Sequence, residues 1–335
     1  MTYQVLGTTV IDSNARFSLA GITSSNSLSY IEILSPAEEA YTFQGTLFGY
    51  VSGGYLNSPG PTTNVIERFP FTSDSNSSDQ GDLTQARRLV TGNSSDISGY
   101  TSGGYTPGFI NVTDKFRFVT NSNATDVGDL ITATYGMSGQ SSSTNGYFSG
   151  GDQAPGSVNT IVRFPFAVDT NALDVGDLSQ ARSGVTGQSP TVSGYVSGGG
   201  NPNAVNTIEK FPFTTTTNAT DIGDLSVSRR SRPAGQSSTT HGYTSGGYGP
   251  PALNTIDKFP FATDTNATDI GDLFRSNSQL SGQSSNLSGY SSGGTTGPST
   301  GRVNTIDKFP FSSDSNATDV GDLTAVKDST AGQQN

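Results

Sequence analysis

A short acidic turn recurs through the sequence, and its side chains carry oxygen ligands of the kind that calcium prefers. In the copy DTNATDIGD the four candidate ligands are Asp264, Asn266, Asp269 and Asp272. The spacing departs from an EF-hand loop, because Asp269 stands where that loop needs a glycine, and the glycine follows two residues later. Two other copies have Thr216 and Asn121 in place of the first acid. An Asx turn, in which these side chains bond nearby backbone, is the simpler interpretation, and calcium is the alternative.

Catalytic side chains are scarce in this chain. His241 is its one histidine and it has no cysteine, so a Ser-His-Asp triad would have to use His241, and a zinc site of several histidines or thiolates cannot be built. A polysaccharide-degrading enzyme would need clustered carboxylates or a histidine at the mouth of a channel. The acids lie instead in regular turns, so we expect a non-enzymatic protein with no cofactor other than the calcium alternative.

The composition favours an all-β protein. The chain has 335 residues, of which 42 are glycine and 31% are apolar, and its formal net charge is −11. Short alternating stretches with regularly placed aromatic residues predict strands joined by tight turns. No apolar run is long enough to span a membrane, and no basic excess is available to neutralise nucleic-acid phosphates. The N-terminal residues lack the pattern of a secretory signal, so we expect no export by that route.

The acidic turns belong to a longer unit that occurs six times. A Gly-Tyr dipeptide recurs at intervals of about 48 residues, with its tyrosine at Tyr50, Tyr100, Tyr147, Tyr195, Tyr243 and Tyr290. Each copy contains four candidate strands, which in sequence order resemble TGQSP, GYVSGG, NTIDKFPF and TDIGDL. Such a meander has two apolar faces that it cannot bury alone, so packing several sheets around an axis, as in a β-propeller, is the expected solution.

The third strand of each copy has a regular pattern. Phe259 and Phe261 should share one face and Ile256 should point to the other, because side chains alternate along a strand. Pro260 cannot donate a hydrogen bond and should mark a strand end or a bulge. The basic residue Lys258 and the aspartate Asp272 have counterparts in every copy, so we expect a charged pair between adjacent strands of one blade.

This pattern resembles the kelch repeat: a double glycine that ends one strand, a variable loop, an acid-basic-aromatic strand, a turn, a short strand and then an arginine. That arginine is present in three copies, as Arg87, Arg182 and Arg229. Thr134, Asn277 and Lys327 replace it in the others, and the tryptophan usual in kelch blades is missing. The resemblance implies a six-bladed kelch-like β-propeller over residues 46–335, preceded by a short N-terminal arm over residues 1–45.

Two segments could supply the innermost strand of the first blade. The C-terminal TAGQQN, residues 330–335, matches the first-strand motif of the other copies but no Gly-Tyr follows it. Gln44 precedes Tyr50 by a spacing close to that found in another copy, so the N-terminal side could supply the strand instead. We favour the C-terminal segment.

The variable loops after the double glycines are the candidate binding sites, since on propellers the repeated strands form the scaffold and the variable loops carry the site. In a kelch-like propeller these loops and those after GDL open on one face. The candidate ligand-binding residues on this face are Tyr55, Tyr105, Phe109, Tyr248, Arg302, Arg88, Arg230 and Arg232, with Arg87, Arg182 and Arg229 nearby. Aromatic rings with arginines suit stacking on sugar rings or on a protein surface. The alternative is that these tyrosines only complete the loops.

Two further resemblances indicate the biological setting. VIDS in the N-terminal segment resembles a phrase common near the start of bacteriophage tail-fibre and related virion proteins. The repeat GYxSGG…IDKFPF…NATDVGDL resembles repeats in structural proteins of marine tailed phages, particularly those that infect cyanobacteria. These resemblances imply a virion protein, released by host lysis, oligomeric on the particle and attached to other virion proteins through residues 1–45. They imply tail-fibre-like adhesion to a host-surface glycan or protein, with non-adhesive decoration of the capsid or tail as the alternative.

Overall fold

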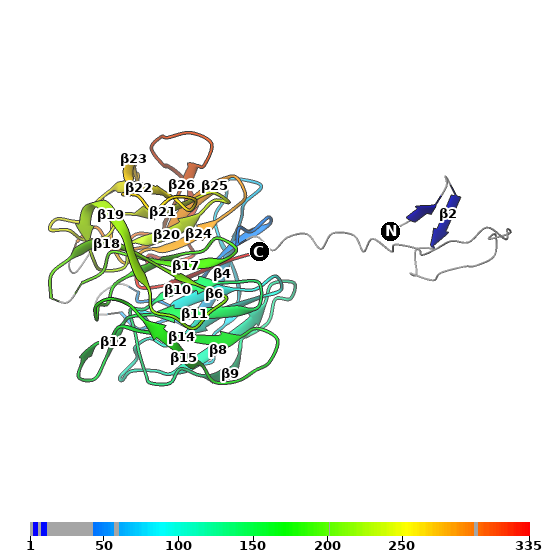
Figure 1. Cartoon of the computed structure of the whole chain (residues 1–335), viewed down its shortest axis with the longest axis horizontal. Helices are drawn as coiled ribbons and strands as arrows, with labels where there is room; N and C mark the ends of the chain where they lie inside the picture. The colour runs from blue at the N-terminus through cyan, green and yellow to red at the C-terminus, as the bar shows by residue number, and fades with distance from the viewer. Residues whose placement is uncertain (1–2, 6–7, 12–42, 57–59, 201, 298–300) are drawn as a thin grey trace. The chain divides into compact units, whose positions relative to one another are not determined.

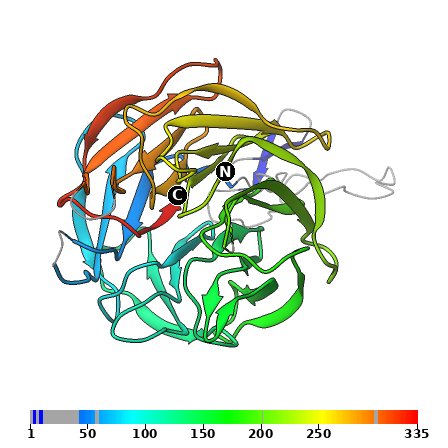
Figure 2. The ribbon, with the colours of Figure 1, turned by 90° about the vertical axis from the view of Figure 1, so that its left-hand side faces the viewer.

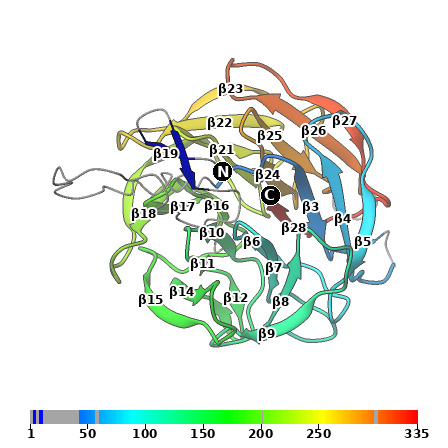
Figure 3. The same cartoon turned by 90° about the vertical axis from the view of Figure 1, so that its right-hand side faces the viewer.

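A computed structural model describes residues 3–5, 8–11, 43–56, 60–200, 202–297 and 301–335. The described residues form strands and no helix, so none of them belongs to a candidate membrane-spanning helix. From residue 43 onward, six four-stranded antiparallel sheets surround one axis (Figures 1 and 3). The protein is therefore an all-β, six-bladed β-propeller, which confirms the predicted fold class.

The strands of each blade are given from the axis to the rim. The first three blades are β28 (Ala331–Gln334), β3 (Phe48–Ser52), β4 (Val65–Pro70) and β5 (Ser78–Asp82); β6 (Thr91–Ser94), β7 (Ser98–Ser102), β8 (Val112–Arg117) and β9 (Thr125–Asp129); and β10 (Ser138–Ser141), β11 (Asn145–Ser149), β14 (Thr160–Pro165) and β15 (Leu173–Asp177). The last three are β16 (Thr186–Gln188), β17 (Ser193–Ser197), β18 (Val205–Pro212) and β19 (Thr220–Arg229); β20 (Ala234–Ser237), β21 (His241–Ser245), β22 (Thr255–Pro260) and β23 (Thr268–Asp272); and β24 (Ser281–Ser284), β25 (Ser288–Ser292), β26 (Thr305–Pro310) and β27 (Thr318–Asp322).

Two short hairpins lie outside the blades. β12 (Asp152–Gln153) and β13 (Gly156–Ser157) form a hairpin in a loop of the third blade. β1 (Tyr3–Val5) pairs with β2 (Thr8–Ile11) in a separate unit, residues 1–40. Most of the predicted attachment arm, residues 12–42, lies outside the described residues.

The C-terminal segment closes the ring, as favoured from the sequence. β28 pairs with β3, and Gln333 lies opposite Tyr50. Gln44 does not enter that sheet: its side-chain amide donates to the carbonyl oxygen of Ser237 at 2.9 Å, and Gly45 bridges Ser285 of the last blade. The chain therefore crosses the inner strands of its neighbours before it enters β3.

Aromatic side chains pack between adjacent blades. The ring of Tyr195 lies 5.6 Å from that of Phe259 and 4.9 Å from that of Phe261, both in the next blade. Ile256 points to the other face and belongs to the following interblade cluster, with Tyr243. This confirms the predicted alternation. The equivalent tyrosines Tyr50, Tyr100, Tyr147, Tyr195, Tyr243 and Tyr290 are all buried. Small interblade clusters of this kind replace one large core, which explains how a chain with few apolar residues folds.

Amide side chains link the inner strands around the axis. Gln188 donates through Nε2 to the carbonyl oxygen of Tyr243 in the next blade at 3.0 Å. The same bond is made by Asn93, Gln140, Gln236, Gln283 and Gln333, so it runs around the whole ring. The neighbouring glycines pack backbone against backbone, and a Cβ added to Gly187 would lie 2.2 Å from the carbonyl oxygen of Gly139. The Gly-Gln motif is thus a blade-to-blade joint.

The acidic turns make a second set of joints at the rim. Asp269 accepts a hydrogen bond from the backbone of Gly271 at 3.1 Å, which confirms the Asx turn. Asn266 accepts one from the backbone of Asp224 in the preceding blade at 3.1 Å, and its counterparts are Asn76, Asn123, Asn171, Asn218 and Asn316. The turn therefore bonds both to itself and to its neighbour.

The predicted charged pair within a blade is wrong. The register of the two strands places Asp272 opposite Thr255 at the strand end, while Lys258 lies opposite Thr268. Lys258 instead pairs with Asp314 in the turn of the next blade at 2.6 Å. Three other lysines make the same contact, in the pairs Lys115–Asp169, Lys210–Asp264 and Lys308–Asp74. The two copies whose basic residue is arginine, Arg68 and Arg163, precede blades whose turns lack this acid, having Asn121 and Thr216.

The three arginines expected near the variable loops, Arg87, Arg182 and Arg229, are buried in ion pairs between blades. Arg229 is buried and its Nη2 lies 2.6 Å from Oδ2 of Asp257 in the next blade. The equivalent pairs are Arg87–Asp114, Arg182–Glu209 and Lys327–Glu67. Among the described residues no such pair spans the remaining two junctions, where Thr134 and Val162 line one cavity and Asn277 and Asp307 hold the equivalent repeat positions. These positions face the next blade because the chain leaves the rim there and returns to the axis.

Candidate binding site

One face of the propeller carries the loops that follow the double glycines; Figure 2 views the ring from this side. Gly53 and Gly54 both have positive φ values, 63° and 118°, which turn the chain away from the end of β3. Tyr55 then forms an antiparallel bridge with Asp328, the residue after the buried Lys327. Equivalent bridges join Arg88 to Tyr105, Tyr135 to Asp152, Ser183 to Gly200, Arg230 to Tyr248 and Ser278 to Thr295. The bases of the variable loops are thus fixed to the neighbouring blade.

Arg88 lies between two tyrosines on this face. Its guanidinium carbon is 4.4 Å from the ring centre of Tyr55 and 5.3 Å from that of Tyr105. Arg302 covers Tyr55 as well, at 4.5 Å. A cation held over an aromatic face is attracted by the ring quadrupole, so these side chains order one another.

Further aromatic rings extend this row. The ring of Phe109 lies 5.9 Å from that of Tyr105 and 5.2 Å from that of Tyr135, and it is 38% exposed. Tyr135 also contacts Tyr105 at 6.3 Å. We call the continuous set Tyr55, Arg88, Tyr105, Phe109, Tyr135 and Arg302 the aromatic-arginine patch. It crosses loops of three neighbouring blades.

The structure brings five of the eight predicted site residues into this patch and separates the other three. Tyr248 and Arg230 bridge each other on the same face in the fourth and fifth blades, where Arg230 bonds the carbonyl oxygen of Pro202. Arg232 is buried in the central channel. Tyr135 was missed by the sequence analysis, although it occupies the same repeat position as Arg88, directly after the buried interblade residue.

The two arginines of the patch differ in their ion pairing. Nε of Arg302 pairs with Oδ2 of Asp328 at 2.7 Å, and burial raises the pKa of Asp328. Burial, with the nearby charge of Asp152, raises the pKa of Tyr135, so its hydroxyl stays protonated at neutral pH. Arg88 has no salt-bridge partner among the described residues, so its charge is available to a ligand.

A pocket of about 370 Å³ adjoins the patch at the mouth of the central channel. Tyr135 belongs to both, and the pocket wall continues with Asp152, Ser183, Arg230 and Gln279. The pocket and the patch together place aromatic rings beside polar and charged side chains, and ligand sites combine such groups to bind and orient a small molecule.

Three of the four calcium candidates are used in other contacts. Asp264 pairs with Lys210 at 3.1 Å, and Asn266 and Asp269 accept the backbone hydrogen bonds of the rim joint. Across the described ranges, no group of three or more acids or histidines is placed to hold a metal ion. His241, the one histidine, lies at the start of β21, and its Nδ1 is 2.9 Å from the hydroxyl of Thr240.

No profile of a known protein family matches this chain, and no curated protein is similar to it in sequence.

Proposed function

We propose that this propeller is a non-enzymatic binding module whose aromatic-arginine patch recognises a glycan. The observation that carries this proposal is the position of Arg88, held between Tyr55 and Tyr105 without an acidic partner among the described residues. Phe109, the exposed ring of the patch, offers an aromatic face for stacking on the apolar C–H face of a sugar ring. A guanidinium donates in a fixed fork to hydroxyl or carboxylate oxygens, which suits a sugar carrying an acidic group.

The support for a rigid site is the way its side chains are held. Their backbones are bridged to the next blade, and the two arginines are stacked on rings before any ligand arrives. A site that is ordered in advance loses less side-chain entropy on binding, so a modest contact area can give useful affinity.

The setting that we infer is a bacteriophage virion, where the propeller acts as a tail-fibre-like adhesin on the host surface. The resemblance of the repeat to structural proteins of marine tailed phages supports this setting. The geometry is compatible with display, because the chain enters at residues 43–46 and leaves at Asn335 at the end of the blades opposite the loops. Attachment through residues 1–45 and oligomerisation on the particle are parts of the same proposal. Non-adhesive decoration of the particle is the alternative.

The test is binding of the full chain to a glycan array and to intact candidate host cells. The variants Arg88→Ala and Tyr105→Ala are expected to weaken binding at least tenfold. Arg68→Ala is the matched control, because Arg68 stacks over Phe48 at 4.3 Å in the same way but at the opposite end of its blade. It is expected to bind like the wild type.

Loss of binding in the control as well as in the patch variants would contradict a site on the loop face. Absence of binding to any glycan or host cell would favour the decoration alternative. The copy number on a purified particle separates the two further, because a fibre is present in few copies and a surface decoration in many.

A further inference from the structure

The fifth blade contains a one-residue insertion at the axis. Gln188 follows Arg182 by six positions, whereas Gln236 follows Arg229 by seven, and the same six-residue spacing holds in the other copies. Ser231 has the left-handed backbone that Leu89, Gln279 and Ser329 share at the same position of other blades, and Arg232, with φ 57°, is the additional left-handed residue. The insertion therefore adds one residue to a ring of left-handed positions, and that residue is charged.

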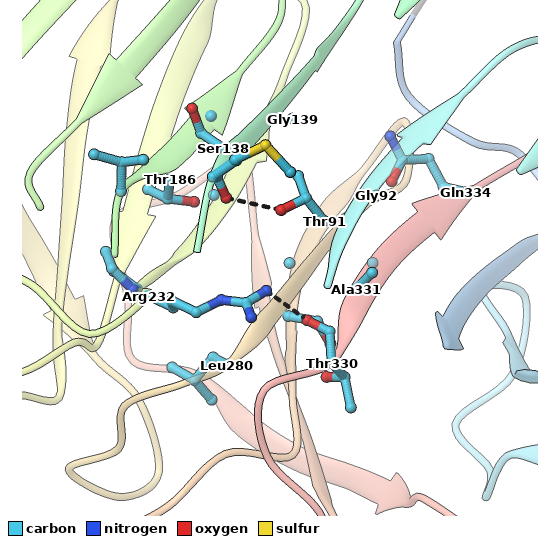
Figure 4. A pocket seen from close by; sticks show the side chains of 18 of the residues that line it. Thr91, Gly92, Ser138, Gly139, Thr186, Arg232, Leu280, Thr330, Ala331 and Gln334 are labelled. Carbon is cyan, nitrogen blue, oxygen red and sulfur yellow. Dashed lines mark hydrogen bonds between the residues drawn. The ribbon is translucent and has the colours of Figure 1, made fainter. Parts of the chain in front are cut away.

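The insertion delivers a charged side chain into the centre of the ring. Arg232 is 7% exposed and extends across the channel, where its Nη2 donates to the carbonyl oxygen of Thr330 at 3.0 Å and to that of Val90 (Figure 4). The acid whose charge acts on it, Asp328, already pairs with Arg302. Burial lowers the pKa of Arg232 to about 10, so the group remains charged at neutral pH.

This buried cation is incompletely satisfied. Its Nη1 makes no hydrogen bond to the described protein, and the same is true of the buried hydroxyl of Thr330. A buried charge without a counter-ion is strongly destabilising unless hydrogen bonds and an opposite charge compensate it.

A small cavity adjoins both groups. It has a volume of about 70 Å³, and Thr91, Ser138, Thr186 and Ser281 are among the residues that line it. The hydroxyls of Thr91, Ser138 and Ser281 already donate to backbone carbonyl oxygens, at 3.0, 3.3 and 3.4 Å. No carboxylate is among the described residues that line the cavity. The cavity therefore adjoins a positive charge and two groups whose hydrogen bonds are unmade, Nη1 of Arg232 and the hydroxyl of Thr330.

We propose that this axial cavity binds one small inorganic anion, of the size of chloride, between the guanidinium of Arg232 and the unbonded hydroxyl of Thr330. The anion neutralises the buried charge and accepts the hydrogen bonds that the protein leaves unmade. It binds the closed ring and not the unfolded chain, so it stabilises the folded state by mass action.

The direct test is a crystal of the full chain grown in bromide, with data collected at the bromine absorption edge. An anomalous peak within hydrogen-bonding distance of Arg232 Nη1 is expected. Water density without anomalous signal at that position would overturn the proposal. Parallel crystals in phosphate distinguish a site for halide from one that accepts a larger oxyanion.

The solution test compares melting temperatures in sodium chloride and in sodium gluconate of equal ionic strength, since gluconate is too large for the cavity. The wild type should melt several degrees higher in chloride, and Arg232→Gln should lose this difference. Arg68→Gln is the matched control, since Arg68 lies outside both the cavity and the patch, and it should keep the difference. An equal response of the wild type and Arg232→Gln would refute the site; if that variant does not fold, the bromide experiment decides.

Discussion

Replacing Asp307 by asparagine should stabilise the protein at neutral pH. Asp307 lies in β26 at one of the two junctions where the buried cation is missing, because Asn277 stands where Arg229 and its counterparts pair with an acid. Its carboxylate accepts one backbone hydrogen bond, from Phe274 at 3.2 Å, and its Oδ1 has no partner. Burial is the main reason that the pKa of Asp307 rises from 3.8 to about 6.

The size of the effect follows from that pKa. The difference between 3.8 and about 6, at 1.36 kcal/mol for each pKa unit, corresponds to about 3 kcal/mol. Between these two pH values the folded state holds a proton that the unfolded chain has lost, so this group lowers the free energy of unfolding as pH rises through the window. The asparagine variant should therefore exceed the wild type by up to about 3 kcal/mol above pH 7 and match it below pH 4.

The assay is urea unfolding followed by circular dichroism at pH values from 3.5 to 8. The difference in the free energy of unfolding between the Asp307→Asn variant and the wild type isolates the contribution of Asp307 from that of other carboxylates that titrate in the same range. Asp257→Asn is the matched control, since it removes the acid partner of buried Arg229 and should destabilise by about 3 kcal/mol or more. A variant that follows the pH profile of the wild type would refute the argument.

Three further predictions concern the joints between blades. Gly187→Ala should reduce the free energy of unfolding by at least about 3 kcal/mol, because its Cβ would meet the carbonyl oxygen of Gly139 at 2.2 Å. Urea unfolding measures this loss, and a loss below about 1 kcal/mol would contradict the packing. Thr134→Arg and Val162→Asp should each destabilise the protein alone but compensate each other together, because both residues line a cavity of about 130 Å³ between two blades. A double-mutant cycle should give a coupling energy of at least about 2 kcal/mol, and additive effects would refute the pairing. Deletion of residues 331–335 should abolish cooperative unfolding, since it removes β28 from the first sheet, and an unchanged transition would show that the ring does not need this strand.

The architecture was predictable because its causes repeat. Within each copy, local backbone conformation explains the double glycines, the alternation around Phe259 and the position of Pro260. The number of copies gives the number of blades. Ring closure by residues 331–334 was also predictable, because the inner-strand motif appears once without its following Gly-Tyr.

The interblade contacts were not predictable, because they depend on how far each blade is rotated against the next. Lys258 and Asp272 share a copy and were paired for that reason, yet the strand register pairs them with Thr268 and Thr255, and the neighbouring turn supplies Asp314. The residues of the aromatic-arginine patch also come together only through the rotation of each blade against the next. Arg88 and Tyr55 come from different loops, and their contact follows from a bridge geometry that spacing along the chain does not encode.

The strand that closes the ring has a consequence for how the protein folds. Gln333 bonds the hydroxyl of Ser52, a residue 281 positions away, so the first sheet cannot be completed until nearly the whole repeat array has been made. Contacts between such distant residues form slowly, because the entropy of closing a long loop must be overcome first. Until then β3 presents an open edge that can pair with another chain. Synthesis and assembly of this propeller therefore pass through a late, concentration-sensitive step, after which no sheet of the ring offers its inner edge to a neighbour.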